Sequence, residues 1–239
     1  MMRNVVPLTQ RELAASFFSP VAYIVAAVFL VASGNLFLGE TLLPGREASV
    51  RPMFDGMARL LVFAIPLLTM RSLAEEFSTG TIETLMTAPV SDVEVILGKF
   101  LGVFVFYAAL LVTTLLHVVL VTVYGGADAA VILLAYLGML LLGALFIAVG
   151  LFASALTRYQ LVAALVGMGI LSVFTFVVDQ LGRWRSGAWR SVLGYVNVLG
   201  HFDEFSKGLL DTRSIVFLLS LTVLFLFLSV KVLESKRWR

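Results

Sequence analysis

Long uncharged apolar runs constrain the fold of this chain more than any other feature of its sequence. Residues 100–127 carry no formal charge apart from the titratable His117, and residues 129–157 carry none at all. About 20 apolar residues in a helix are enough to cross the hydrocarbon core of a bilayer. Of the 239 residues, 60% are hydrophobic, against about 45–50% in soluble domains, so we expect an integral membrane protein.

The pattern predicts an all-α fold, a single transmembrane domain over residues 1–239 with six membrane-spanning helices. The predicted spans are residues 20–39, 57–74, 100–127, 129–157, 161–178 and 214–231. Ser19 and Pro20 begin the first span as an N-cap followed by proline at the first helical position. The second span is the weakest, because Arg59 and Arg71 bound a short apolar run that contains Pro66. It crosses only if both arginine side chains extend to opposite interfaces.

The segments outside the spans divide between the two membrane faces. Residues 1–19 read as a helix lying on the membrane surface, with Arg11 and Glu12 opposite apolar side chains. Small residues near position 33 also fit a cleaved signal peptide, which the long polar region before them disfavours. Residues 179–213, rich in aromatic residues and glycine, are expected to form short helices at the extracytoplasmic face. Basic residues are almost equally divided between the faces, and the basic C-terminal tail favours two cytoplasmic termini.

Residues 75–99 form a charged segment between the second and third spans, and we expect it to be cytoplasmic. Gly80 interrupts the preceding helix and can serve as the N-cap of a short helix that begins at Thr81, with Glu83 in capping-box register. Pro89 ends that helix, because a proline disfavours helical geometry in the residue before it.

The short helix over residues 81–88 is predicted to be amphipathic. Ile82 and Leu85 fall on its apolar face, whereas Thr84 falls on its polar face. Ser91 then opens the next helix, with Glu94 three positions later in a second capping box. So much local order favours a rigid element that docks to a partner, against the plainer interpretation of an ordinary cytoplasmic loop.

The sequence contains no recognisable nucleotide-binding or catalytic motif. Gly98 and Lys99 resemble the end of a phosphate-binding loop, but Val93 stands in place of its first glycine and Phe100 in place of its Ser or Thr. The chain has no cysteine, which excludes disulfides and thiolate metal sites. Its net charge of +2 is too small to indicate nucleic acid as a partner. We therefore expect no catalytic, cofactor or metal site, and no enzyme activity, in this chain.

A few polar residues near or within the spans admit two interpretations. His117, with Thr113 one helical turn before it, could line a path or relay protons, or could simply hydrogen-bond a neighbouring group. His201 with Asp203 and Glu204 could suggest a metal or a base, although a solvated cluster is the better interpretation.

Pairs of small residues four positions apart permit close approach between helices. Such approach could occur within the chain or at a subunit interface. The pairs are Gly98 with Gly102, Ala144 with Ala148, and Ala163 with Gly167.

The charged segment also carries a resemblance to a known family. Residues 75–85 read EEFSTGTIETL, residues 88–91 read APVS, and Gly98-Lys99 follows. With Arg11-Glu12-Leu13, Ser19-Pro20 and the run HFDEFSKG at 201–208, the chain resembles type-2 (ABC-2) ABC transporter permeases over almost its whole length. Among these it looks most like the gliding-motility-associated permease and the nitrous-oxide-reductase maturation permease.

The resemblance implies an exporter built from two six-helix halves, each seated on a cytoplasmic ATPase that binds the ATP and Mg. Residues 81–88 would be the coupling helix. The second half would be another copy or a related chain, and membrane lipid and an extracytoplasmic auxiliary subunit are further expected partners. The membrane would be a bacterial or archaeal-type cell (inner) membrane. The expected contacts with the ATPase are Glu75, Glu76, Gly80, Thr81, Ile82, Glu83, Thr84, Leu85 and Pro89.

Two other classes of function compete with this one. A stand-alone channel, or a proton-coupled carrier that uses His117, would work without an ATPase. An intramembrane enzyme would need a paired catalytic constellation, which the sequence does not offer. The sequence does not indicate the substrate.

Overall fold

The structure, a computed structural model, describes residues 4–41, 50–82, 90–125, 129–184 and 194–237, and its regular elements there are all helices. In chain order they are α1 (Val5–Phe17), α2 (Pro20–Leu36), η1 (Phe37–Thr41), α3 (Arg51–Thr79), α5 (Asp92–Gly125), α6 (Ala129–Leu156), α7 (Gln160–Ser172), η2 (Val173–Val177), α8 (Val178–Trp184), α10 (Val198–Ser206) and α11 (Thr212–Arg237).

Six helices in the described part of the chain are long and apolar enough to cross a membrane, which confirms the predicted fold class. They are Pro20–Gly39, Arg51–Thr79, Asp92–Thr122, Ala129–Leu156, Gln160–Leu181 and Thr212–Lys236. The second helix is longer than the predicted span of residues 57–74, since α3 runs from Arg51 to Thr79. Its 29 residues reach about 43 Å, more than the roughly 30 Å of hydrocarbon.

The helices α3 and α6 form the centre of the bundle. In the most apolar window of each, 56% of the residues are buried, against 28% in α2, α5 and α11. This position permits α3 to be the least apolar of the six but does not require it, since α6 is buried to the same extent and is the most apolar. A central helix contacts other helices rather than lipid, so its side chains need to match protein neighbours.

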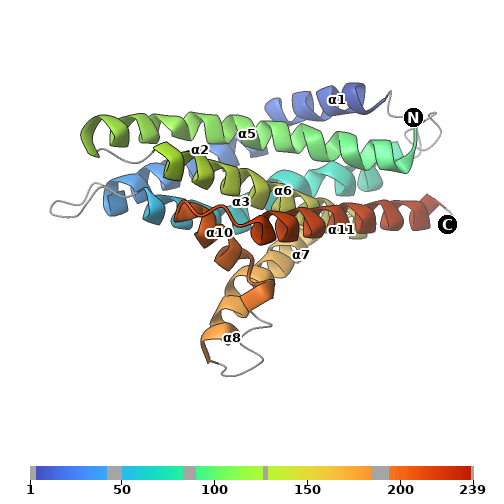
Figure 1. Ribbon diagram of the computed structural model, residues 1–239. Helices are drawn as coiled ribbons and strands as arrows, with labels where there is room; N and C mark the ends of the chain where they lie inside the picture. The colour runs from blue at the N-terminus through green and yellow to red at the C-terminus, as the bar shows by residue number, and fades with distance from the viewer. Residues whose placement is uncertain (1–3, 42–49, 83–89, 126–128, 185–193, 238–239) are drawn as a thin grey trace.

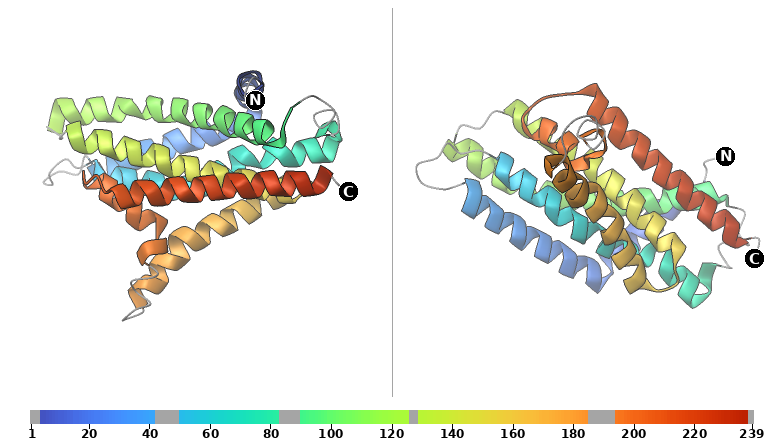
Figure 2. Two further views of the ribbon diagram at one scale, coloured as in Figure 1. Left: turned by 45° about the vertical axis from the view of Figure 1, so that its right-hand side comes forward. Right: turned by 90° about the horizontal axis from the view of Figure 1, so that it is seen from below.

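The long helices lie side by side (Figures 1 and 2), and the start of α1 and the end of α11 lie at one end of the molecule (Figure 1). The end of α3 and the start of α5 lie at this same end, which we call the base. Helices α7 and α8 lean away from the bundle towards the opposite end, where α10 fills the angle between them and the other helices (Figure 1).

Close packing across small residues brings α1 onto α5 and α6 onto α3. A Cβ atom at Gly98 would lie 2.5 Å from the Cβ of Leu8, and one at Gly102 would lie 2.6 Å from the Cβ of Glu12. A Cβ at Gly150 would lie 2.1 Å from the hydroxyl of Thr69. The predicted pair Gly98 and Gly102 therefore allows α1 to pack closely against α5 of the same chain.

The other two small-residue pairs also pack within the chain. Ala144, Ala148 and Ala163 are buried, and Gly167 faces Pro66 of α3.

Candidate functional site

The charged segment begins where α3 ends at Gly80. Gly80 has φ +75°, the left-handed conformation that favours glycine and commonly ends a helix. The sequence predicted an N-cap role instead, in which the backbone is usually extended. Thr81 and Ile82 are helical again, as predicted, and Glu83, Thr84, Leu85 and Pro89 lie outside the described residues.

The second capping box, which starts α5, is confirmed. The Ser91 amide donates to Glu94 Oε2 at 3.0 Å, and the Glu94 amide donates to Ser91 Oγ at 3.3 Å. A further bond, from the Asn4 amide to Glu94 Oε1 at 3.5 Å, brings the chain's N-terminal helix to the start of α5. The start of α5 is therefore fixed by its own side chains and by α1.

Four charged residues, Arg11, Glu12, Glu76 and Lys99, form what we call the basal cluster. Lys99 Nζ lies 2.8 Å from Glu76 Oε1 and 3.2 Å from Glu12 Oε2, and it donates to the Ser72 carbonyl at 2.6 Å. Arg11 Nη2 lies 3.0 Å from the same Glu76 oxygen. One ammonium thus uses its three donors on α1 and α3, and it joins both helices to α5.

Burial makes the basal cluster different from a surface ion pair. The side chains of Lys99, Glu76 and Glu12 are only 7%, 11% and 14% exposed, whereas that of Arg11 is 61% exposed. Two cations face two carboxylates, so the cluster is neutral as a whole. Removing one member of such a group leaves a buried charge without its partner, which is strongly destabilising.

The structure turns Glu76 inwards. Its residue is 8% exposed, and its Oε2 is buried without a hydrogen-bond partner among the described residues. Glu76 thus holds the helices together, and it is not exposed for the direct contact with a partner that the sequence suggested.

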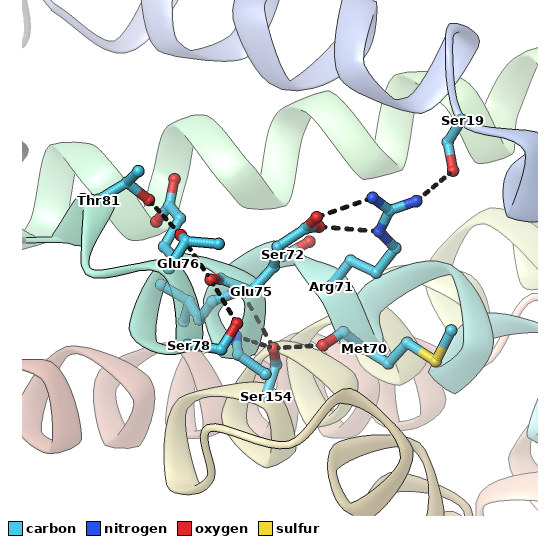
Figure 3. Close-up of polar contacts among 12 residues, drawn as sticks. Ser19, Met70, Arg71, Ser72, Glu75, Glu76, Ser78, Thr81 and Ser154 are labelled. Carbon is cyan, nitrogen blue, oxygen red and sulfur yellow. Dashed lines mark hydrogen bonds and ion pairs between the residues drawn. The ribbon is translucent and has the colours of Figure 1, made fainter.

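Arg71 and Glu75 form a two-pronged ion pair on the same face of α3 (Figure 3). Arg71 Nε and Nη2 each lie 2.8 Å from a carboxylate oxygen of Glu75, and Nη1 donates to Ser19 Oγ at 3.1 Å. A paired and hydrogen-bonded guanidinium is less costly at a membrane interface than a free one. This arrangement allows the short apolar run after Arg59 to belong to a spanning helix.

Ser154 of α6 binds the backbone of α3 at the turn that carries Arg71 (Figure 3). Its Oγ accepts from the amides of Leu73 and Ala74 at 3.1 and 3.0 Å and donates to the Met70 carbonyl at 3.0 Å. A hydroxyl has one proton and two lone pairs, so all its capacity is used. These amides and this carbonyl are backbone groups inside α3. Their hydrogen bonds with Ser154 therefore fix α6 to α3, one turn from the basal cluster.

An apolar cluster completes the base on the other side of α3. Ile82 is 8% exposed and packs in a buried cluster that includes Phe77 and residues of α5, α6 and α11. Lys236 of α11 lies over the Phe77 ring, 3.9 Å from its centroid, and donates to the Ala155 carbonyl at 2.7 Å. The side chain of Ile82 therefore packs against other residues of this chain. Thr81 is exposed, and its hydroxyl contacts the hydroxyl of Thr79.

The residues expected to line a path lie on α5. His117 is half-buried, and its Nδ1 lies 3.2 Å from the Thr114 carbonyl, with its ring against Phe37. Thr113 is exposed and donates to the Leu110 carbonyl of its own helix. His117 thus makes the local hydrogen bond that was one of its two predicted interpretations.

Charged residues at the opposite end form a second group, Arg51, Asp203 and Lys207, which we call the α10 cluster. Asp203 pairs with both cations. Although partial burial by itself raises the pKa of Asp203, hydrogen bonds from Lys207 and Arg51 lower that pKa below its ordinary value.

The neighbours of Asp203 hydrogen-bond to other groups of the protein. His201 contacts Ser214 and the Tyr195 carbonyl, and Glu204 accepts from Ser214. Within the described ranges no three His, Cys, Asp or Glu residues come together to hold a metal ion.

The sequence did not predict the contacts that this site makes between helices far apart in the chain. It found Lys99 and Glu76 as parts of a motif, but not their contact or the role of Arg11 in it. Nothing in the sequence marks Ser154, a small polar residue in an apolar run. Only the amphipathic pattern around Arg11 and Glu12 offered a signal that the N-terminal helix has a charged face to satisfy.

The chain matches the family described as ABC-2 family transporter protein over residues 9–236. The matched range includes all six spanning helices and the four residues of the basal cluster. No curated protein matches the chain.

Proposed function

Because the chain belongs to the ABC-2 family of transporter proteins, and is therefore a multi-pass permease of an ABC transporter, we propose that it converts ATP hydrolysis on a separate subunit into export of a substrate. Permeases of this family generally work with a cytoplasmic ATPase. We propose that residues 75–99 dock on that ATPase, which binds the ATP and Mg, and that this chain has no ATPase site of its own.

The observation that carries the proposal is the rigid connection of the helices on both sides of the charged segment. Lys99 joins α5 to α3 through Glu76 and to α1 through Glu12. Ser154 joins α6 to the same end of α3. A displacement applied to residues 80–90 would therefore move four helices together rather than bend a loop.

Coupling requires that each nucleotide state favours one arrangement of these helices. A differential of about 1–3 kcal/mol between states is typical of such coupling. In the proposed cycle, closure of two ATPases on ATP brings two bases together, and the long helices carry that movement into the path between two permease halves. The second half is another copy of this chain or a related one.

The topology that goes with this mechanism has both termini and the base in the cytoplasm of a bacterial or archaeal-type cell. The α10 region then faces outwards, where an auxiliary subunit could bind. The base holds both chain ends and the start of α5, so one labelling experiment on intact cells tests all of them together (Figure 1).

A charge reversal in the predicted coupling helix tests the docking. The tagged chain is expressed with its ATPase, and the amount of ATPase retained on purification is measured with the ATP hydrolysis of the complex. We expect Glu83→Lys to retain at least about tenfold less ATPase, because like charges placed across an interface cost several kcal/mol. Lys207→Glu, at the opposite end of the molecule, is the matched control.

Equal retention by the wild type and Glu83→Lys would contradict docking through residues 81–88. Transport by the purified chain without any ATPase would instead support the channel or the proton-coupled carrier. In that case His117→Ala should abolish dependence on the proton gradient.

A further inference from the structure

We propose that a cavity at the base, between α1, α2, α3 and α5, binds the headgroup and the first part of the acyl chains of one membrane phospholipid with a zwitterionic, amine-bearing headgroup. The cavity has a volume of about 340 Å³ and is lined by residues of all four helices. Pockets of about 300–1,000 Å³ are typical of sites for small molecules. The inference needs only the membrane location of the chain and does not depend on the proposed coupling to an ATPase.

The walls of the cavity change from polar to apolar along α3. Thr79, Glu75 and Arg71 line one end, and Leu68 and Leu67 line the other. Thr79 lies twelve positions after Leu67 in the helix, which corresponds to about 18 Å along the axis.

The same change of character occurs on α5. There Lys99 lies at the polar end, followed by Val103 and then Phe106. A lipid, with its charged head and its hydrocarbon chains, has this gradient, whereas a soluble metabolite does not.

The charges in the wall are balanced. Three basic side chains, Arg11, Arg71 and Lys99, meet three acidic ones, Glu12, Glu75 and Glu76, so the formal charge of the lining is zero. Anionic lipids are usually bound by clusters of basic residues without such compensation. A balanced wall favours a headgroup that itself carries one positive and one negative charge.

Three of these side chains, Arg11, Arg71 and Glu75, reach solvent, and two of them can meet the headgroup. Arg11 contacts Glu76 through Nη2, yet its side chain is 61% exposed, and a guanidinium readily binds a phosphate. Glu75 is 37% exposed, and its carboxylate can accept hydrogen bonds from an ammonium as well as from Arg71.

The junction of α1 and α2 gives a lipid access to the cavity. Ser16, Ser19 and Val21, on both sides of this junction, line the cavity. Phe18, between them, is 86% exposed, and α1 buries none of its own residues. An apolar side chain exposed in this way on a surface helix fits insertion into the headgroup region of the bilayer, so the cavity opens beside lipid.

The test measures lipids bound to the purified full-length chain by native mass spectrometry in a mild detergent. The probes are phosphatidylethanolamine and phosphatidylglycerol with identical acyl chains. We expect about one phosphatidylethanolamine per chain and at least about fivefold less phosphatidylglycerol at equal concentration.

Two neighbouring alanines of α1 provide a matched pair of variants. Both are exposed, but only Ala15 lines the cavity. Ala15→Trp should block it and reduce phosphatidylethanolamine binding at least about tenfold, whereas Ala14→Trp should bind like the wild type. Glu75→Gln gives the wall one excess positive charge, so we expect the preference to shift towards phosphatidylglycerol. This second variant leaves the cavity open and tests the charge argument even if Ala15→Trp does not fold.

Three results would overturn the proposal. The first is equal binding of the two lipids by the wild type, and the second is equal binding by the two tryptophan variants. The third is displacement of the lipid by soluble glycerophosphoethanolamine at the same concentration, which would identify a headgroup site without a role for the acyl chains.

Discussion

The two ends of the bundle both carry paired charges, but they use them differently. In the basal cluster the side chain of Lys99 is 7% exposed, whereas in the α10 cluster that of Lys207 is 41% exposed. Buried ions attract one another strongly, because little water competes for them. Exposed ion pairs are screened by water and salt and contribute little to the stability of the fold. The base is thus built to keep α1, α3 and α5 in one arrangement, and the opposite end can respond to salt and pH.

The largest expected effect comes from neutralising the buried ammonium. Lys99→Met leaves Glu76 and Glu12 buried without their main partner, so we expect a loss of about 3–5 kcal/mol in the free energy of unfolding. Lys207→Met, in the α10 cluster, should cost less than about 1 kcal/mol. Thermal unfolding of both purified variants in one detergent measures the difference.

A double variant separates a lost charge partner from lost packing. Lys99→Met with Glu76→Met removes one charge of each sign, so it should recover a large part of the stability lost in Lys99→Met alone. Equal losses in the Lys99 and Lys207 variants would contradict the contrast between the two ends.

Ser154→Ala should have the next largest effect. The change removes three buried hydrogen bonds between α6 and the backbone of α3, each worth about 0.5–1.5 kcal/mol, so we expect a loss of about 1–3 kcal/mol in the free energy of unfolding. Ser229→Ala is the matched control, because that buried hydroxyl bonds only the Phe225 carbonyl of its own helix among the described contacts. If both substitutions shift the unfolding temperature equally, Ser154 has no special role at the base.

A substitution that pushes α1 away from α5 should lower the free energy of unfolding by a similar or smaller amount. Gly102→Leu places side-chain atoms where Glu12 already packs, and overpacking of this kind costs about 1–3 kcal/mol. Gly169→Leu, at a position with nothing within 4 Å of a Cβ, should be nearly neutral. The stability of the two variants, measured side by side, shows whether the close approach of α1 is required.

The smallest effect is the pH response of the α10 cluster. Because the pKa of Asp203 is lowered in the folded protein from its ordinary value of 3.8, the folded state binds fewer protons than the unfolded state. The stabilisation is therefore fully present above that ordinary value and is lost as the pH falls through the lowered pKa. The stability difference between the wild type and Asp203→Asn should shrink over that range, and a difference that grows there would show the wrong sign.

Predictions from the sequence were accurate for most of the features that a single segment decides. The six spans follow from apolar length, and the start of α5 from the Ser91 and Glu94 capping box. Gly80 was recognised as a break, but its geometry is that of a helix end. The predicted span of residues 57–74 is shorter than α3, which runs from Arg51 to Thr79, because the width of the hydrocarbon limits a predicted span, whereas a helix can continue beyond it.

The sequence by itself determined that this is a membrane protein with six crossings and a charged segment between the second and third. These properties depend on composition and spacing within single segments of the sequence. Only the tertiary structure decided which charges meet. Arg11, Glu76 and Lys99 lie far apart in sequence, and their contact depends on how closely three helices pack. That packing turns Glu76 from a candidate surface contact into the buried partner of Lys99.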